Sequence, residues 1–244
     1  MTAEPKRSVV CTTRWLTREP ARTGYCLHMP LASVGQAASA AGGLLLGGAA
    51  RALGAVRPAA KPLHPKGRVV KACLYRDGLE PPLGVEFLDT KSIDEVLVRE
   101  SRAIGLPGSM PDIQGLAIRV PNPDDGYGDL LFATTGWGKL TRFTLTPTRS
   151  TYGRPMTTLL PYRTEAGPVV LGARAVGGQS VELSCAIGDG EWRRFADLVI
   201  TEQDGGDPTI SFDPVVNQLP GLEQYDAVAK LRSPAYDQAR ASRD

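Results

Sequence analysis

Short runs of β-branched and other apolar residues, separated by glycine- and proline-rich turns, constrain the fold of this chain more than any other feature. The runs are Val69–Tyr75, Val96–Arg99, Gly115–Val120, Asp129–Thr134, Val169–Val176, Val181–Ile187 and Leu198–Thr201. The turns between them include Pro121-Asn-Pro-Asp-Asp-Gly126, Gly177-Gly178 and Gly188-Asp-Gly190. Many short strands with such turns are typical of antiparallel sheets and barrels rather than of alternating βα units. We therefore predict an antiparallel β-barrel.

The two ends of the chain carry different patterns, and we predict an α+β fold. Residues 1–30 have no periodicity and are expected to be a disordered extension, whereas the Ala/Gly-rich residues 31–60 are expected to form a helix of small residues. Residues 61–244 are expected to form the barrel domain. Near its end, Leu222–Leu231 and Pro234–Ser242 are predicted as C-terminal helices, because proline is favoured in the first turn of a helix.

The Ala/Gly-rich segment is not predicted to cross a membrane. Gln36, several glycines and Arg51 interrupt it, and a spanning helix needs about 20 predominantly apolar residues. Its apolar run also begins late and has no adjacent basic region, which argues against a signal peptide. Met29 is an alternative native start, because nothing before it has a structural pattern. We expect a protein without a membrane span.

Composition excludes some partners and metal sites. Charged residues make up 22% of the 244 residues and the formal net charge is +2, so no electrostatic argument favours nucleic acid or an anionic membrane. The four cysteines are far apart and form no C-x-x-C pair, which argues against a zinc site and a dense disulfide framework. We expect reduced thiols and a cytoplasmic location.

Two sites in the sequence indicate chemistry. Arg232 precedes Tyr236 by four residues, so on a helix its guanidinium reaches the phenol and stabilises the phenolate. A phenolate is a recognised though uncommon axial ligand of ferric haem. His64, one of two histidines in the chain, is of a residue type that accepts and returns a proton near neutral pH. Together they predict a haem iron with an acid–base group on the opposite face of the porphyrin.

Several short islands of sequence occur in one order between Pro62 and Arg243. They are Leu63-His64-Pro65-Lys66-Gly67, Val98-Arg99-Glu100-Ser101, Asp112-Ile-Gln-Gly115-Leu-Ala-Ile-Arg119, Asp129-Leu-Leu, Phe212-Asp-Pro214, Leu219-Pro-Gly221 and Arg232-x-x-x-Tyr236. With these islands the chain resembles the haem-containing catalase superfamily, and most closely its small, truncated catalase-related peroxidase branch. The resemblance implies an antiparallel β-barrel of catalase type with haem b inside.

On the distal side of the haem, the resemblance implies that His64 is the catalytic acid and base and that Ser101 buttresses its ring. It also implies that Arg99 meets a haem propionate. The paired phenylalanines of the family are missing, and Trp137 is the candidate to contact the cofactor in their place.

On the proximal side, the resemblance implies that Tyr236 is the axial ligand of the iron and that Arg232 is its cationic partner. Arg243 lies seven residues after Tyr236, where the family has a further propionate-binding arginine.

The chain departs from the family at the distal amide. Where the family has an asparagine, the ungapped match gives Ala133, and Lys61 stands where an arginine often precedes the distal histidine. Ala133 cannot donate a hydrogen bond that orients a second peroxide. We therefore expect a haem peroxidase with weak catalase activity, acting on hydrogen peroxide or organic hydroperoxides with a small-molecule reductant. Because the long arms of catalases are absent, we expect a small homo-oligomer such as a dimer.

Three other functions remain open at this point. The first is a hydroperoxide-rearranging enzyme similar to allene oxide synthases, with which Thr134 or Thr135 near the distal face is compatible. The second is a haem-binding or small-ligand carrier with a degenerate catalytic site. The third is a barrel that has lost haem.

Overall fold

The computed structural model describes residues 67–103, 109–122, 126–202, 206 and 210–230. The chain divides into two units between Arg57 and Pro58, and every described residue belongs to the second unit. The segments 1–30 and 31–60 and the predicted helix Pro234–Ser242 lie outside the described residues. Four predicted site residues also lie outside them: His64, Arg232, Tyr236 and Arg243.

Eight of the described strands form a closed antiparallel barrel. They are β1 (Gly67–Arg76), β2 (Ser92–Arg102), β3 (Gln114–Asn122), β4 (Gly126–Thr134), β5 (Met156–Thr157), β7 (Gly167–Gly177), β8 (Ser180–Ile187) and β9 (Arg193–Ile200). They pair in the order β7-β5-β4-β3-β2-β1-β9-β8, and the pairing of β7 with β8 closes the ring. The short strands β6 (Tyr162–Thr164) and β10 (Glu223–Gln224) continue the sheet beside β7.

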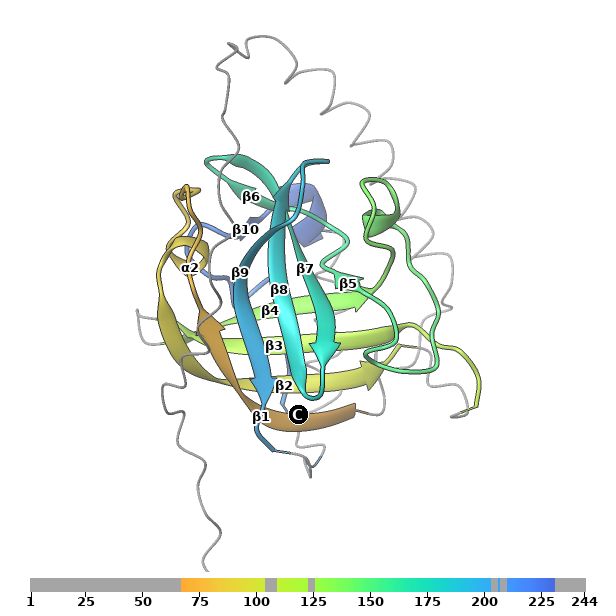
Figure 1. Ribbon diagram of the computed structural model, residues 1–244. Coiled ribbons are helices and arrows are strands. Elements are labelled where there is room, and N and C mark those ends of the chain that lie inside the picture. The colour runs from red at the N-terminus through yellow and green to blue at the C-terminus, as the bar shows by residue number, and fades with distance from the viewer. Residues whose placement is uncertain (1–66, 104–108, 123–125, 203–205, 207–209, 231–244) are drawn as a thin grey trace, which may run out of the picture. The chain divides into compact units, whose positions relative to one another are not determined.

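The predicted strands are confirmed, since each of them overlaps an observed strand of the barrel. In Figure 1, β7, β8 and β9 form the front wall and cross β2, β3 and β4 of the back wall steeply. The strands β5, β6 and β10, the helix α2 (Glu86–Asp89) and the 3₁₀ turn η1 (Thr141–Phe143) are not among the predictions. They have at most four residues each, which is too short for a periodic pattern.

Glycines at two turns adopt backbone conformations that other residues rarely adopt. Gly78, after β1, has φ +79°, and a Cβ there would lie 2.4 Å from the carbonyl oxygen of Asp89. Gly178, in the β7–β8 hairpin, has φ +58° and open space where its Cβ would be. Both glycines lie in segments that the sequence predicts as turns. Glycine avoids the backbone strain that a residue with a side chain would have at these φ values.

Alternation along the strands directs one set of apolar side chains into the barrel. These buried residues are Val70, Ala72, Leu74, Val96, Val98, Leu116, Ile118, Val120, Leu130, Phe132, Met156, Val169, Leu171, Ala173, Val181, Leu183, Cys185, Ala196, Leu198 and Ile200. An eight-stranded barrel is just wide enough for its own side chains to fill it. These side chains occupy the interior between the described strands, and the outer face is therefore the candidate surface for a haem.

Apolar side chains from two segments outside the strands of the barrel extend this core at one end. The helix α2 contributes Phe87 and Leu88, and the segment that leads into β10 contributes Leu219 and Leu222. Phe87 meets Phe195 of β9 edge to face, with ring centroids 5.8 Å apart. In Figure 1, α2 lies at the upper left corner, and the other end of the barrel is where the β7–β8 hairpin turns.

The predicted helix Leu222–Leu231 begins later than expected. Residues 223–224 form β10, which pairs with β6, and helical residues begin at Asp226. The backbone N–H of Gln224 also donates to Gln218 Oε1 at 2.8 Å. Tertiary pairing thus overrides the local helical preference of this segment. Among the described residues, no helix has the length and apolarity that crossing a membrane requires.

The cysteines differ from the prediction. Cys73 is disulfide-bonded, so the expectation of four reduced thiols is wrong. Cys185 is a free thiol inside the barrel, and burial raises its pKa to about 11. The Cys185 thiol is therefore protonated at neutral pH and unreactive as a nucleophile.

Candidate functional site

The candidate site lies on the outer face of β1–β4. Arg99 and Ser101 are both on β2, and Val98, which directly precedes Arg99, points into the core. Because side chains alternate along a strand, Arg99 and Ser101 face outward together. Ser101 is paired with Gly67 of β1 on one side and with Gly115 of β3 on the other.

Strand pairing continues this line of residues around the barrel. We call it the small-residue row, and it consists of Gly67, Ser101, Gly115, Ala133, Thr157 and Gly172. Each member comes from a different strand, and none has a side chain larger than threonine. Other groups can therefore lie close to the backbone of this strip, as side chains over Gly67 and Gly172 already do.

Arg99 lies beside the small-residue row with its guanidinium over Gly67. A Cβ at Gly67 would lie 2.5 Å from Cζ and Nη2 of Arg99, so this arrangement requires glycine. Arg99 is only 8% exposed. A buried guanidinium presents a planar, permanently charged fork of donors, which matches the geometry of a carboxylate. The structure thus brings the predicted propionate ligand Arg99 close to Ser101.

Ala133 lies in the same row as Ser101, two strands away. The two residues are joined through Gly115, so they are about 10 Å apart along the sheet, which is two strand spacings. If β4 were paired with β3 one residue out of this register, the side chain at position 133 would point into the barrel. In the observed register, Ala133, the residue that the ungapped match puts at the distal amide position, lies on the same outer face as Ser101.

Trp137 lies at the far end of the small-residue row. Its ring stacks on Trp192, with centroids 4.3 Å apart and planes inclined by 20°, and Trp192 Nε1 donates to the Trp137 carbonyl at 2.8 Å. Both rings cover Gly172, where a Cβ would lie 2.8 Å from each. Gly172 is four strand spacings, about 19 Å along the sheet, from Ser101. The structure does not place Trp137 next to Arg99 or Ser101.

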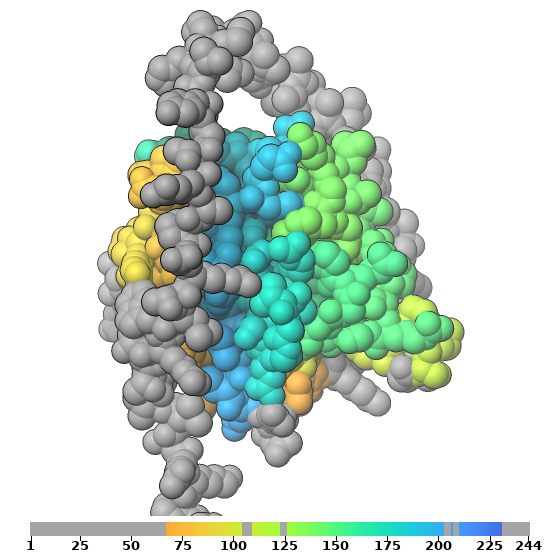
Figure 2. Space-filling model, in the orientation of Figure 1, coloured from red at the N-terminus to blue at the C-terminus, as the bar shows by residue number. Residues whose placement is uncertain are grey.

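Arg142 completes this tryptophan cluster, and sequence reasoning missed it. Its Cζ lies 4.3 Å from the Trp192 ring centroid, and Nη2 donates to the Gly190 carbonyl at 3.1 Å. Desolvation lowers the pKa of Arg142, while the carboxylates of Glu191 and Asp189 act in the opposite direction. An arginine in a three-residue 3₁₀ turn gives no burial signal in the sequence. Figure 2 shows the green segment around η1 directly beside the cyan and blue surface of β8 and β9.

A second polar cluster of the outer face is built around Asp129. Arg119 donates from Nε and Nη2 to the two carboxylate oxygens of Asp129, at 2.8 Å each. Asp129 Oδ2 also accepts from the backbone N–H of Asp213 at 2.8 Å and from Asn217 Nδ2 at 2.7 Å. The Asp129 side chain is fully buried. We call Asp129, Arg119, Asp213 and Asn217 the Asp129 cluster. Its hydrogen bonds to a charged carboxylate make it a structural anchor.

Two aromatic rings enclose the arginine of the Asp129 cluster. The rings of Tyr127 and Phe212 lie 3.8 Å and 4.8 Å from Arg119 Cζ. Arg119 Nη2 also donates to the Ser211 carbonyl at 2.5 Å. The cluster therefore fastens the island that begins at Phe212 to the islands on β3 and β4. These segments are far apart in the sequence and adjacent in the fold.

The described residues fit one edge of a haem. Arg99 is a buried cation beside a strip of small residues, which suits a propionate of a flat ligand. The predicted iron ligand and the predicted distal histidine lie outside the described residues. Within the part of the chain that the structure describes, no group of three or more His, Cys, Asp or Glu residues could hold a metal ion.

Comparisons with known proteins support the fold. No family model matches the chain, and no curated protein matches it. A bacterial catalase structure superimposes with a TM-score of 0.56 at 11% identity, over 78% of this chain and 59% of that one. A fungal catalase structure superimposes with a TM-score of 0.54 at 13% identity, over 92% of this chain and 66% of that one. The chain thus spans less than two thirds of each catalase, and the likeness shows a catalase-like fold.

Proposed function

We propose that this protein is a haem-dependent peroxidase of catalase-like fold that reduces hydrogen peroxide or organic hydroperoxides and has weak catalase activity. The observation that carries the proposal is the register of β1–β4. It puts Arg99, Ser101 and Ala133 on one outer face, beside a strip of small residues. These are the positions at which the resemblance requires a propionate-binding arginine, a buttressing serine and the distal amide.

The covalent chain limits how far His64 can be from this face. His64 precedes Gly67 by three residues, so their Cα atoms lie within about 11 Å of each other in any conformation. Gly67 is itself the cross-strand neighbour of Ser101. This proximity supports the proposed role of the Ser101 hydroxyl in holding the imidazole ring.

Haem b is the proposed cofactor. Arg99 and Arg243 would hold its propionates and Tyr236 would bind the iron, with Arg232 stabilising the phenolate form of Tyr236. Trp137 would contact the cofactor only from the far end of the small-residue row. When bound, haem supplies the redox chemistry that splits the O–O bond of a peroxide.

His64 is the proposed acid and base. Its imidazole would take a proton from one peroxide oxygen and return it to the other. That oxygen would leave as water from hydrogen peroxide or as an alcohol from an organic hydroperoxide, with the two electrons coming from the bound haem. Acid–base catalysis of this kind contributes a factor of about 10² to 10⁴ in rate. Ser101 is proposed as a positioning residue that acts through His64.

Ala133 is the reason for proposing peroxidase rather than strong catalase turnover. Its methyl group offers no hydrogen bond to a second peroxide, so an organic reductant becomes the favoured partner of the second half of the reaction. A peroxide and a small-molecule reductant are thus the proposed partners. A small homo-oligomer such as a dimer and a cytoplasmic location complete the proposal, although the disulfide at Cys73 counts against the location.

The test is the absorption spectrum of the full chain reconstituted with haemin. We expect a Soret band with the features of a high-spin ferric tyrosinate complex. Tyr236→Phe should lose these features, and its matched control Tyr225→Phe should keep them. An unchanged spectrum in Tyr236→Phe would overturn the axial ligand.

A kinetic test follows for the distal side. His64→Ala should retain haem and lose peroxidase activity by about 10² or more, whereas the other histidine provides the control His28→Ala with unchanged activity. Equal activity in both variants would remove His64 from the mechanism. Oxygen release from hydrogen peroxide at the full rate of a catalase would contradict the proposed weak catalase activity.

A further inference from the structure

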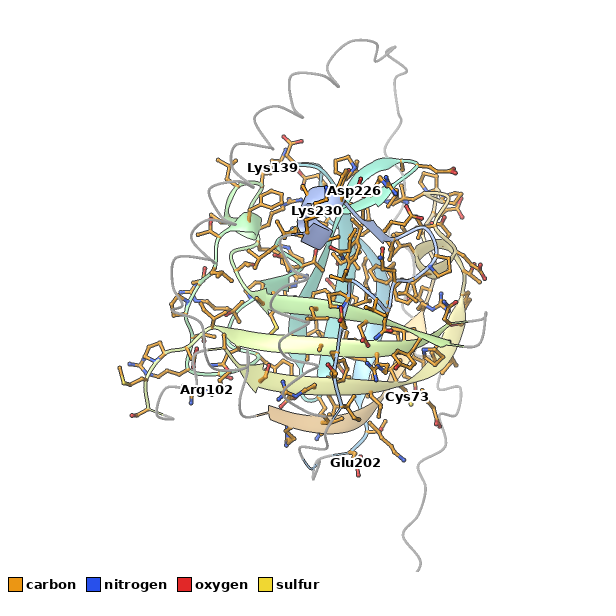
Figure 3. All side chains as sticks on the ribbon, turned by 180° about the vertical axis from the view of Figure 1, so that it is seen from behind. Cys73, Arg102, Lys139, Glu202, Asp226 and Lys230 are labelled. Carbon is orange, nitrogen blue, oxygen red and sulfur yellow. The ribbon has the colours of Figure 1, made fainter. Side chains whose placement is uncertain are left out.

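The end of the barrel opposite α2 contains a cavity of about 370 Å³. It is lined by Arg68, Glu100, Tyr152, Gly178, Gln179, Ile200 and Glu202. The mouths of β-barrels are among the preferred places for small-molecule sites, whose volumes run from about 300 to 1,000 Å³. In Figure 3, Glu202 lies at the lower rim of the barrel just below β1, and Lys139 lies at the far end.

This cavity is separate from the candidate haem face. Glu100 stands between Arg99 and Ser101 in the sequence, and alternation along β2 turns it to the other side of the sheet. The same stretch of β2 therefore contributes to two different surfaces.

One wall of the cavity is a connected set of three polar side chains. Glu100 Oε2 accepts from Arg68 Nη2 at 2.8 Å, and Glu100 Oε1 accepts a short hydrogen bond from the Tyr152 hydroxyl. The Glu100 side chain is only 11% exposed. The Tyr152 ring packs against the apolar core, and this packing holds its hydroxyl in place. These contacts make the wall preorganised for a ligand.

The charges of the lining sum to one negative charge. Arg68 offsets Glu100. Burial, and then the hydrogen bond to Glu100, raise the pKa of Tyr152, so its phenol is neutral at physiological pH. Glu202, on the rim, supplies the remaining charge. Ile200, which is 7% exposed, provides an apolar floor, and Gly178 leaves open space above the hairpin.

We propose that this barrel-mouth cavity binds a small organic amine in its cationic form. At about 30 Å³ for each water-sized atom, the cavity volume of about 370 Å³ accommodates about a dozen non-hydrogen atoms. The ammonium group pairs with Glu202, the apolar part lies on Ile200, and a hydroxyl of the ligand meets the polar wall at Glu100. The proposal is independent of haem and of peroxidase activity.

Three probes with one phenol ring and different charges test the proposal. Tyramine is cationic, tyrosol is neutral and 4-hydroxyphenylacetate is anionic. Titrated into the isotopically labelled full chain, tyramine should shift the amide resonances of Gly178, Gln179 and Glu202 and should bind most tightly, with the anion weakest. Shifts spread over the surface, or equal affinity for the three probes, would overturn the proposal.

Charge variants give a second, directional test. Glu202→Gln should weaken tyramine binding by about threefold to fivefold and leave tyrosol unchanged, while Arg68→Gln should strengthen tyramine binding. The matched control is Glu191→Gln, because Glu191 is 87% exposed, pairs with Lys139 at 3.4 Å and does not line the cavity. The proposal fails if Glu202→Gln and Glu191→Gln give the same affinity.

Discussion

Two arginines on the outer face of the barrel are used in opposite ways. Arg119 places two donors on the buried carboxylate of Asp129 and has an aromatic ring within 4 Å of its guanidinium carbon. Arg99, on the neighbouring strand β2, lies over the bare backbone of Gly67 at the edge of the small-residue row. The first arginine is held between two aromatic rings, and the second lies against the backbone of a glycine.

Arg119 belongs to a structural anchor, whereas Arg99 has a proposed role in ligand binding. The Asp129 carboxylate on β4 accepts four hydrogen bonds from two other segments, β3 and residues 213–217, and fastens the three segments together. Removing it leaves a cation uncompensated. Arg99 lies beside small residues and is the proposed partner of a haem propionate. Changes at the Asp129 cluster should therefore cost stability, and changes beside the small-residue row should cost function.

The largest expected effect is at the anchor. Asp129→Ala should lower the free energy of unfolding by about 3–5 kcal/mol. The substitution leaves the Arg119 guanidinium without its carboxylate and removes the hydrogen bonds that hold the segment around Asp213. Denaturant unfolding monitored by tryptophan fluorescence measures the change. Glu191→Ala, an exposed carboxylate, should change it by less than about 0.5 kcal/mol. Similar losses in the two variants would show that the Asp129 cluster is not an anchor.

The next effect is expected in the small-residue row. Ala133→Asn should raise the ratio of oxygen evolution to peroxidase turnover by about tenfold or more, because a well-placed donor is worth at least this much in rate. The variant should unfold at nearly the same denaturant concentration as the parent. An unchanged ratio in a haem-loaded variant would show that position 133 does not face the substrate.

A smaller effect is expected where Arg99 lies over the backbone. Gly67→Ala should displace the guanidinium and weaken haem binding by about threefold to fivefold, since one hydrogen-bonded charge contact is loosened. Gly126→Ala is the matched control, because nothing lies within 4 Å of the added Cβ. Haem titration by absorbance compares the two. If Gly126→Ala weakens haem binding as much, Arg99 does not hold the cofactor.

The smallest effect is expected at Tyr152, whose hydroxyl donates to Glu100 of β2. Its pKa is raised, so the folded protein keeps the phenolic proton above about pH 10, where the unfolded chain loses it. The free energy of unfolding should therefore fall as pH rises beyond about 10, and the fall should be shallower in Tyr152→Phe. Denaturant unfolding across this range measures both slopes. Parallel slopes would show that Tyr152 ionises equally in both states.

Much of the fold could be predicted from local pattern. The strands alternate over several residues and end at glycines such as Gly78 and Gly178, whose φ values are positive. The short strands β5, β6 and β10 could not be predicted, because two or three residues carry no period. The late helix start at Asp226 depends on the pairing of β10 with β6, which are distant in the sequence.

The candidate site was predictable to a lesser degree. Arg99 and Ser101 are two residues apart on a strand, so their shared face follows from the sequence. The Asp129 cluster and the stacking of Trp137 on Trp192 join segments separated by up to 88 residues, and no local pattern reports them. The filling of the barrel interior could not be predicted, because the sequence does not show how tightly a closed barrel is packed.

The amino-acid sequence by itself determined the strands, their turns and the residues that share a face, because side-chain alternation is a property of the local backbone. Only the tertiary structure decided which strands are neighbours, that the ring closes on an interior full of side chains, and that Arg99 lies over Gly67. These outcomes depend on hydrogen bonding and packing between distant segments, whose register is chosen by the whole chain.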